Sequence, residues 1–214
     1  MPEYPATIAR RVVHEIEIKR SRFITHLEPV TSVAEADAFI AEVRKKHWDA
    51  RHNCVAMITG VTGDQARSSD DGEPSGTAGV PMMEVLRHRD VTDLVAVVTR
   101  YFGGIKLGAG GLVRAYSGAV SEALDHAQRV DRRALTAVRI DVPHAEAGRF
   151  DNLLRDWTAR HDSTLGEPVY GAAAVYEAWA PEAELPALIA DVATWSSGAL
   201  TPVVGETRVT DVPA

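Results

Sequence analysis

The feature that most constrains the fold of this chain is a glycine-rich loop between an apolar run and an amphipathic run. Residues 94–99 predict a buried strand, and residues 112–126 have the periodicity of a helix. The loop and its flanks carry five glycines and three cations: Gly103, Gly104, Gly108, Gly110, Gly111, Arg100, Lys106 and Arg114. Glycine lacks a Cβ atom, so backbone N–H groups can approach a ligand closely, and the helix N-terminus adds unpaired donors. The arrangement therefore favours a phosphate-like anion.

The common phosphate-binding glycine motifs do not fit this loop. Residues 104–111 lack the Lys-Ser/Thr pair that ends a P-loop. The dinucleotide fingerprint aligns with Gly108 and Gly110, but Val113 stands where its third glycine is needed. Glycine runs also form tight turns that let a helix pack closely on a sheet. The loop by itself leaves a structural turn and an anion site equally favoured.

The composition is that of an ordinary globular protein. The chain has 214 residues, 25% of them charged and 45% hydrophobic, and can form one large or two small domains. It contains no apolar run of about 18 residues and no signal-peptide pattern at its start. A single cysteine, Cys54, excludes an internal disulfide bond and fits a reducing compartment. We therefore expect a cytoplasmic protein without a membrane contact.

The net charge of −7 is unevenly distributed and argues against bulk electrostatic coating of nucleic acid. Residues 1–130 contain 16 Lys or Arg and 17 Asp or Glu, a net charge of −1. Residues 131–214 contain 7 Lys or Arg and 13 Asp or Glu, a net charge of −6. Any cationic surface is therefore expected to be local and to lie in the first part of the chain.

The order of predicted elements divides the chain into two domains, residues 1–130 and 131–214, with a linker at Asp131–Arg133. The first domain has a hairpin and a helix capped by Ser32, followed by alternating strands and helices. These elements are expected at residues 12–19, 22–27, 32–46, 53–60, 81–87, 94–99 and 112–126, with turns over 61–77. The second domain has strands at 135–142, 164–170, 173–180 and 200–207 and helices at 145–160 and 182–195. Its β-α-β-β-α-β order is that of a ferredoxin-like domain.

A second candidate cluster lies at the start of the strand over residues 53–60. Arg51 and His52 are predicted ligand contacts. A thiolate nucleophile or a zinc ligand is the alternative for Cys54, but zinc needs about four ligands and no ligand spacing is present. Free cysteine is among the most buried residue types, so we predict that Cys54 is structural.

Two further segments have a structural and a functional interpretation. Tyr101 and Phe102 are suited to stacking on an unpaired base, but neighbours on a strand face opposite sides, so at least one is expected in the core. The loop Asp70–Glu73 lacks the spacing of a calcium loop and is expected to be an ordered turn whose Asp and Ser side chains cap backbone N–H groups. No Ser/His/Asp order or paired-carboxylate pattern indicates a catalytic centre.

Four motifs together resemble the IMPACT/YigZ family. They are RYFGGIKLGAGG at residues 100–111, DARHNC at 49–54, SDDGEPSGTAG at 69–79 and KRSRFI at 19–24, and the match is collinear over residues 12–126. The rest of the chain resembles the smaller ferredoxin-like domain of the bacterial, YigZ-like members. Eukaryotic members carry an additional N-terminal domain for a kinase-regulatory partner. That role is not expected here.

The resemblance implies an α+β fold in which a left-handed βαβ domain, like domain 2 of a ribosomal protein, precedes the ferredoxin-like domain. The pair is similar to domains IV and V of elongation factor G, although fold does not fix function. It also implies contact with RNA or the ribosome, or with a protein of the translation machinery, in the regulation of translation. We expect no enzymatic activity, metal or cofactor. The alternatives are an enzyme that acts on a small phosphorylated or nucleotide ligand in the same cleft, and a protein-interaction module.

Overall fold

The structure is a computed structural model that describes residues 4–213, and it confirms the α+β class. It divides into two compact units, which we describe separately. The second unit comprises Arg133–Thr210, and the first comprises the chain before it together with the segment from Asp211. The boundary therefore falls two residues after the predicted one. No helix within residues 4–213 is long and apolar enough to cross a membrane.

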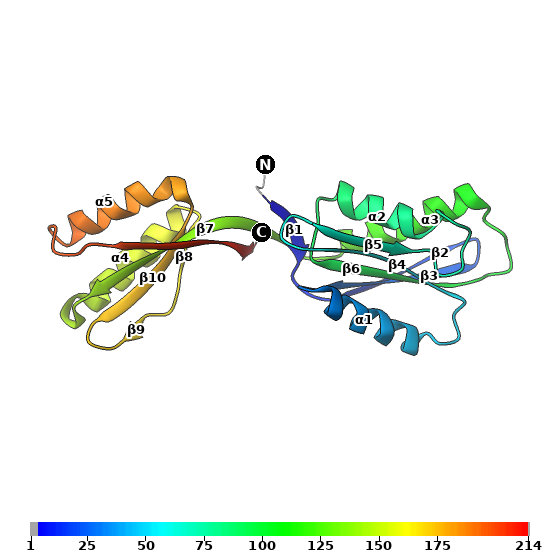
Figure 1. Ribbon diagram of the computed structural model, residues 1–214, viewed down its shortest axis with the longest axis horizontal. Coiled ribbons are helices and arrows are strands. Elements are labelled where there is room, and N and C mark those ends of the chain that lie inside the picture. Colours follow the sequence, from blue (N-terminus) through cyan, green and yellow to red (C-terminus); the bar gives the residue numbers. More distant parts are fainter. Residues whose placement is uncertain (1–3, 214) are drawn as a thin grey trace. The chain divides into compact units, whose positions relative to one another are not determined.

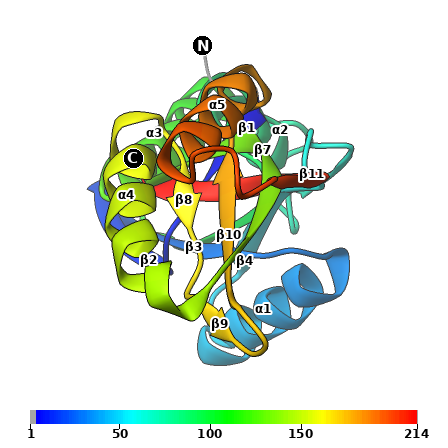
Figure 2. The same ribbon diagram turned by 90° about the vertical axis from the view of Figure 1, so that its left-hand side faces the viewer.

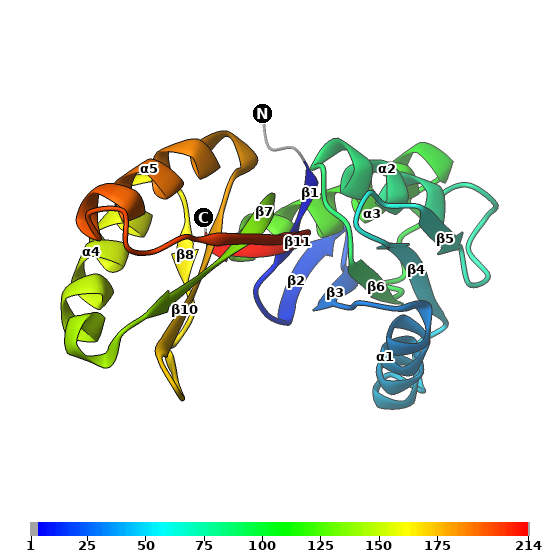
Figure 3. The same ribbon diagram turned by 60° about the vertical axis from the view of Figure 1, so that its left-hand side comes forward.

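The first unit is built on a five-stranded antiparallel sheet (Figure 1). Its strands pair in the order β2 (Val12–Ile18), β3 (Ser21–Pro29), β6 (Leu94–Tyr101), β4 (His52–Thr59) and β5 (Gln65–Ser69). Helix α1 (Val33–Lys46) covers one face, and α2 (Gly79–His88) and α3 (Ala109–Asp125) cover the other (Figure 3). Both faces of the central strand β6 are therefore buried, which explains its apolar run. That this unit is a left-handed βαβ domain stays a prediction.

Local sequence signals explain how these elements begin and turn. Ser32 caps α1, since its Oγ accepts a hydrogen bond of 3.2 Å from the backbone N–H of Glu35, as predicted. The alternation in β2 exposes Val13, Glu15 and Glu17 and turns the residues between them toward the unit. The β2–β3 hairpin turns at Lys19 and Arg20, which have φ angles of 49° and 64°.

The second unit has the strand–helix–strand–strand–helix–strand order that ferredoxin-like domains share. Its strands pair in the order β11 (Val203–Pro213), β7 (Arg129–Val142), β10 (Ala174–Ala180) and β8 (Thr164–Leu165), and β9 (Val169–Tyr170) also pairs with β10. Helices α4 (Ala147–Arg160) and α5 (Leu185–Trp195) each follow one turn of 3-10 helix and pack on these strands (Figure 2). Phe150, Trp157 and Tyr176 are the largest side chains of this core.

Several predicted element boundaries were wrong. The predicted linker Asp131–Arg133 lies within β7, where Arg132 Nη1 donates to Asp93 Oδ2 at 2.8 Å and Nε donates to Asp211 Oδ1 at 2.9 Å. The segment 61–77 contains β5, an edge strand whose residues are all exposed and polar or small, so it has no apolar pattern. The strand expected over 164–170 is interrupted, and Tyr4–Ile8 form a further strand, β1, that pairs with β7.

Candidate functional site

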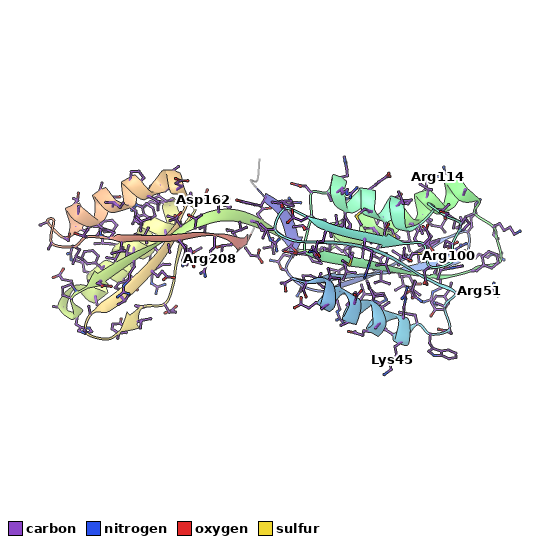
Figure 4. The ribbon with its side chains drawn as sticks, viewed as in Figure 1. Lys45, Arg51, Arg100, Arg114, Asp162 and Arg208 are labelled. Carbon is purple, nitrogen blue, oxygen red and sulfur yellow. The ribbon has the colours of Figure 1, made fainter. Side chains whose placement is uncertain are left out.

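The glycine loop forms one wall of a pocket of about 360 Å³ in the first unit. Strands β4 and β6 are neighbours, so that His52 pairs directly with Arg100 across the sheet. The loop after β6 then places Lys106 and the start of α3 against the same pocket. Half of the predicted contact residues line it, namely Arg51, His52, Arg100, Lys106 and Gly108. Figure 4 shows Arg51, Arg100 and Arg114 at the same end of this unit.

The N-terminus of α3 opens onto this pocket through Gly108 and Ala109. The cap residue Gly108 has φ 71° and ψ 166°, a conformation that favours glycine, and no side chain of residues 4–213 caps the helix. Its first turn contains no acidic residue. The first N–H groups of a helix have no partner within the helix and carry partial positive charge. The helix therefore presents free donors where an anion can reach them.

Arg100 lies at the pocket but is held by a carboxylate that sequence analysis did not foresee. Arg100 is 7% exposed, and its Nη1 donates to Glu73 Oε1 at 2.7 Å. The same Glu73 oxygen accepts a hydrogen bond of 2.8 Å from the hydroxyl of Tyr116 on α3. Arg100 Nε is buried without a hydrogen-bond partner among the described residues. Arg100 was predicted as a phosphate contact, but the structure places it in a buried ion pair that leaves one of its donors unsatisfied.

Arg51 and Lys106 supply the accessible positive charge of the pocket. Both are exposed, and neither forms an ion pair with another residue in the range 4–213. Arg114 does not line the pocket; its guanidinium lies beside Gly110 in the first turn of α3, since a Cβ atom added there would be 3.7 Å from Arg114 Nη1. The cations near the start of α3 thus come from three places: the sheet end at β4 and β6, the glycine loop, and α3 itself.

The other predicted glycines shape the loop rather than line the pocket. Gly103 packs against the β2–β3 turn, where an added Cβ atom would lie 2.0 Å from the carbonyl of Arg20, and its N–H donates to Ser21 Oγ at 3.2 Å. Gly104 has φ 85°, which favours glycine. Gly110 and Gly111 lie in the first turn of α3, and a Cβ atom on Gly111 would approach Leu107 Cβ to 3.1 Å. Part of the glycine content therefore serves packing and turn geometry.

The acidic loop before the pocket is an ordered turn, as predicted. Asp70 Oδ1 accepts hydrogen bonds from the N–H groups of Ala78 and Gly79 at 3.0 and 2.8 Å, and Oδ2 accepts one from Gly76 at 2.7 Å. Burial raises the pKa of this carboxyl, but the three backbone hydrogen bonds outweigh it and lower the pKa below its ordinary value. Within residues 4–213, no group of three or more His, Cys, Asp or Glu side chains is placed to hold a metal ion.

Cys54 is fully buried in β4, which confirms its predicted burial. Its Sγ donates to the carbonyl of Asp70 at 3.0 Å. Burial raises the pKa of this thiol to about 12. A nucleophilic cysteine needs a lowered pKa and an accessible thiolate. The geometry therefore fits a structural cysteine.

The prediction that Tyr101 or Phe102 points into the core was wrong. Tyr101 ends β6 and is half-buried, where its hydroxyl contacts His47 Nδ1 at 3.1 Å and donates to Asp49 Oδ1 at 2.9 Å. Phe102 follows the strand and is 53% exposed. Arg100 occupies the inward position next to them, because the ion pair with Glu73 makes its burial tolerable.

Comparisons with known proteins place this sequence in a family. The Impact N-terminal domain family matches residues 19–124. The IMPACT family member YvyE of Bacillus subtilis is 49% identical over 150 residues, or 70% of this chain and 69% of that protein. The IMPACT family member YigZ of Escherichia coli is 38% identical over 202 residues, or 94% of each chain. A crystal structure described as a hypothetical protein is 37% identical, covers 96% of this chain and 99% of its own, and has a TM-score of 0.60.

The chain belongs to the IMPACT family. All of the residues that line the pocket lie within the matched range 19–124. Eukaryotic IMPACT proteins are more distant: Protein IMPACT of Xenopus laevis is 34% identical over 107 residues, or 33% of its length. The pocket is thus a feature of the part of the chain that defines the family.

Three kinds of pocket residue were missed by sequence reasoning. Glu73 was assigned to a turn, and its pairing with Arg100 depends on the register of β4, β5 and β6. Pro74, Leu107 and Leu112 form an apolar wall, although nothing in their sequence pattern distinguishes them from core or loop residues. Ala109 was taken for loop, whereas it begins α3. The one available signal was the position of Glu73 in the motif 69–79.

Proposed function

We propose that this protein binds RNA, at the pocket between the glycine loop and β4, by holding phosphate groups without reading their sequence. The observation that supports this most is the uncapped N-terminus of α3, which opens into the same pocket as Arg51 and Lys106. Backbone N–H groups and flexible cations are the groups that proteins use to hold phosphate in place. The proposed link to translation and the ribosome rests on the resemblance to the IMPACT family.

The charge distribution supports a local contact rather than a broad cationic surface. The exposed cations around α3 belong to the first 130 residues, where the net charge is −1, while the acidic remainder carries −6. Repulsion by acidic regions keeps a polyanion from binding elsewhere. We therefore propose that the second unit supports or regulates the contact rather than supplies phosphate ligands.

We also propose a binding role without turnover. The cysteine considered as a nucleophile, Cys54, is buried, and burial raises the pKa of its thiol to about 12. Glu73 Oε1 accepts hydrogen bonds from both Arg100 and Tyr116, so this oxygen is already engaged within the protein. These contacts favour a binding site over a catalytic one.

The second candidate is an enzyme that acts on a small phosphorylated or nucleotide ligand in this pocket. The volume of about 360 Å³ favours it, because pockets for small ligands measure about 300–1,000 Å³. Such an enzyme would saturate with the small ligand and be stabilised by it against heat. A protein-interaction module would instead retain protein partners after nuclease treatment.

The test is RNA binding across a salt series, with wild type beside Arg51→Ala/Lys106→Ala. We expect the double variant to lose at least about tenfold in affinity and its salt slope to become shallower by about 1.4, the value for two phosphate contacts on a single strand. The matched control, Lys45→Ala/Arg160→Ala, removes two exposed cations from α1 and α4 (Figure 4 labels Lys45) and should behave as wild type. Equal losses in both variants, or no binding near physiological salt, would refute the proposal.

A further inference from the structure

Phe102 is an exposed aromatic ring at the wall of the pocket, and among the described residues it is not one of those that pack against the hydrophobic core. It is 53% exposed and follows directly on β6. The guanidinium carbon of Arg100 lies 5.7 Å from the centroid of the Phe102 ring, so a cation is positioned over the ring. Because the ring is half-exposed, a flat ligand can still stack on it.

The rest of the pocket divides into an apolar wall and a charged wall. Pro74, Leu107 and Leu112 contribute apolar surface, whereas Arg51, Lys106 and the N-terminus of α3 contribute positive charge. A phosphate group alone needs the charged wall and leaves the apolar surface in water. A nucleotide unit fits both, since it joins a phosphate to a flat base with apolar faces.

Arg100 provides an independent indication that a ligand belongs here. Its side chain lines the pocket and is more than nine-tenths buried, and its Nε has no hydrogen-bond partner within residues 4–213. An unpaired buried donor is costly, and in native proteins it calls for a partner. The single pairing with Glu73 leaves Arg100 with donors that an anionic ligand can use.

We propose that the pocket binds one unpaired nucleotide unit, with its base stacked on Phe102 and its phosphate at the N-terminus of α3. This inference rests on the proposed function and narrows it from RNA in general to a single-stranded or terminal nucleotide. In a duplex the bases are stacked on their neighbours and only the edges and the backbone are accessible. A duplex can therefore reach the charged wall but cannot fill the pocket.

The experiment compares three ligands of equal length with wild type and Phe102→Leu: single-stranded oligoadenylate, its abasic analogue and a blunt RNA duplex. Stacking on an aromatic side chain contributes enough affinity that Phe102→Leu should bind oligoadenylate at least about fivefold more weakly. Its affinity for the abasic strand and its melting temperature should not change. Phe102→Trp should retain the wild-type affinity. Tyr170→Leu, a change at a 65% exposed aromatic residue of the second unit, is the matched control.

The outcomes separate this inference from the proposed function. Equal affinity of wild type for the abasic strand and oligoadenylate, or no loss in Phe102→Leu, would overturn the nucleotide pocket. If, in that case, Arg51→Ala/Lys106→Ala still weakened RNA binding, the proposed phosphate recognition would be supported without base stacking. Competition by adenosine monophosphate would support a free nucleotide as the source of the unit, whereas competition by the oligomer alone would support a strand.

Discussion

Two helices in the first unit begin in opposite electrostatic situations. At α2, the carboxylate of Asp70 accepts hydrogen bonds from the N–H groups of Gly76, Ala78 and Gly79 at 2.7–3.0 Å. At α3, Gly108 provides no side-chain cap and Lys106 lines the adjoining pocket, while the carboxylate of Glu73 in that pocket is paired with Arg100 and Tyr116. Both helices pack on the same face of the sheet.

Under the proposed function, the N-terminus of α2 serves the fold and that of α3 is left for a ligand. The partial positive charge at the start of a helix is satisfied by any nearby anion. The protein supplies that anion itself at α2, through Asp70. At α3 it supplies cations instead and keeps the cap position in a conformation, φ 71°, that a capping serine or aspartate rarely adopts. The comparison therefore predicts that the two sites respond oppositely to added or removed carboxylates.

The largest effect is expected from Glu73→Gln, which removes the carboxylate beside the α3 site. Glu73 and Arg100 are both more than nine-tenths buried, and loss of one partner from a buried ion pair costs about 3 kcal/mol or more of unfolding free energy. The uncompensated charge of Arg100 should also make RNA binding tighter. Urea unfolding at pH 7 and RNA titration measure the two changes.

The control for Glu73→Gln is Glu15→Gln, which breaks the exposed pair of Glu15 with Arg22. Exposed ion pairs contribute about 0–1 kcal/mol, so this variant should unfold almost as wild type does. A Glu73→Gln protein that is folded but binds RNA more weakly would contradict the expectation that the uncompensated charge of Arg100 strengthens RNA binding.

Asp70→Asn should give the next largest effect, and at the opposite site. The amide retains one oxygen but turns a donor toward the N–H of Gly76, and hydrogen bonds to charged groups are worth about 1.5–3 kcal/mol. We expect a loss of about 2 kcal/mol in unfolding free energy with no change in RNA affinity. Asp64→Asn, in an exposed turn, is the control. If Asp70→Asn bound RNA more weakly and Asp64→Asn did not, the start of α2 would also contribute to RNA binding, and the proposed difference between the two helices would be wrong.

The fold was largely predictable because its periodic elements are long and its termini carry local signals. The capped helix α1 and the apolar strand β6 were found from sequence near their observed bounds. The edge strand β5 was not, because none of its residues is buried. Nor was the continuous strand β7, whose charged residue Arg132 is stabilised by Asp93, 39 residues earlier in the chain. An ion pair between residues so far apart in the chain produces no periodic pattern in the sequence.

The site was predictable in its loop but not in its electrostatics. Glycines beside cations at the start of a helix indicated where Gly108 and Lys106 would meet. The burial of Arg100 and its pairing with Glu73 depend on three strands being in register, which the sequence pattern does not specify. Phe102 is exposed just after β6 ends at Tyr101, and the pattern of the strand does not specify the position of a residue beyond its end.

Ala109→Asp makes the start of α3 resemble that of α2, and the comparison predicts opposite effects on stability and binding. Ala109 is exposed at the first position of the helix, where a carboxylate is favourable by about 0.3–1 kcal/mol. The same charge should repel phosphate and weaken RNA binding at least about tenfold. Ala109→Asn keeps the size without the charge and should bind nearly as wild type. If Ala109→Asp bound RNA as tightly as wild type does, the start of α3 would not be part of the RNA-binding site.

The smallest effect is expected from acid titration, which should change the unfolding free energy through Asp70 near the start of α2 but not through the start of α3. The pKa of Asp70 lies below its ordinary value of 3.8 in the folded protein, so its contribution is complete above that pH and is lost as the pH falls through the folded-state pKa. Urea unfolding of wild type and Asp70→Asn should therefore differ at pH 7, and the two should converge as the pH falls below 3.8 and through the folded-state pKa of Asp70. A difference that stayed constant over this range would show that the charge of Asp70 does not stabilise α2. Since α3 has no acidic residue in its first turn, its start should acquire such an acid dependence in Ala109→Asp.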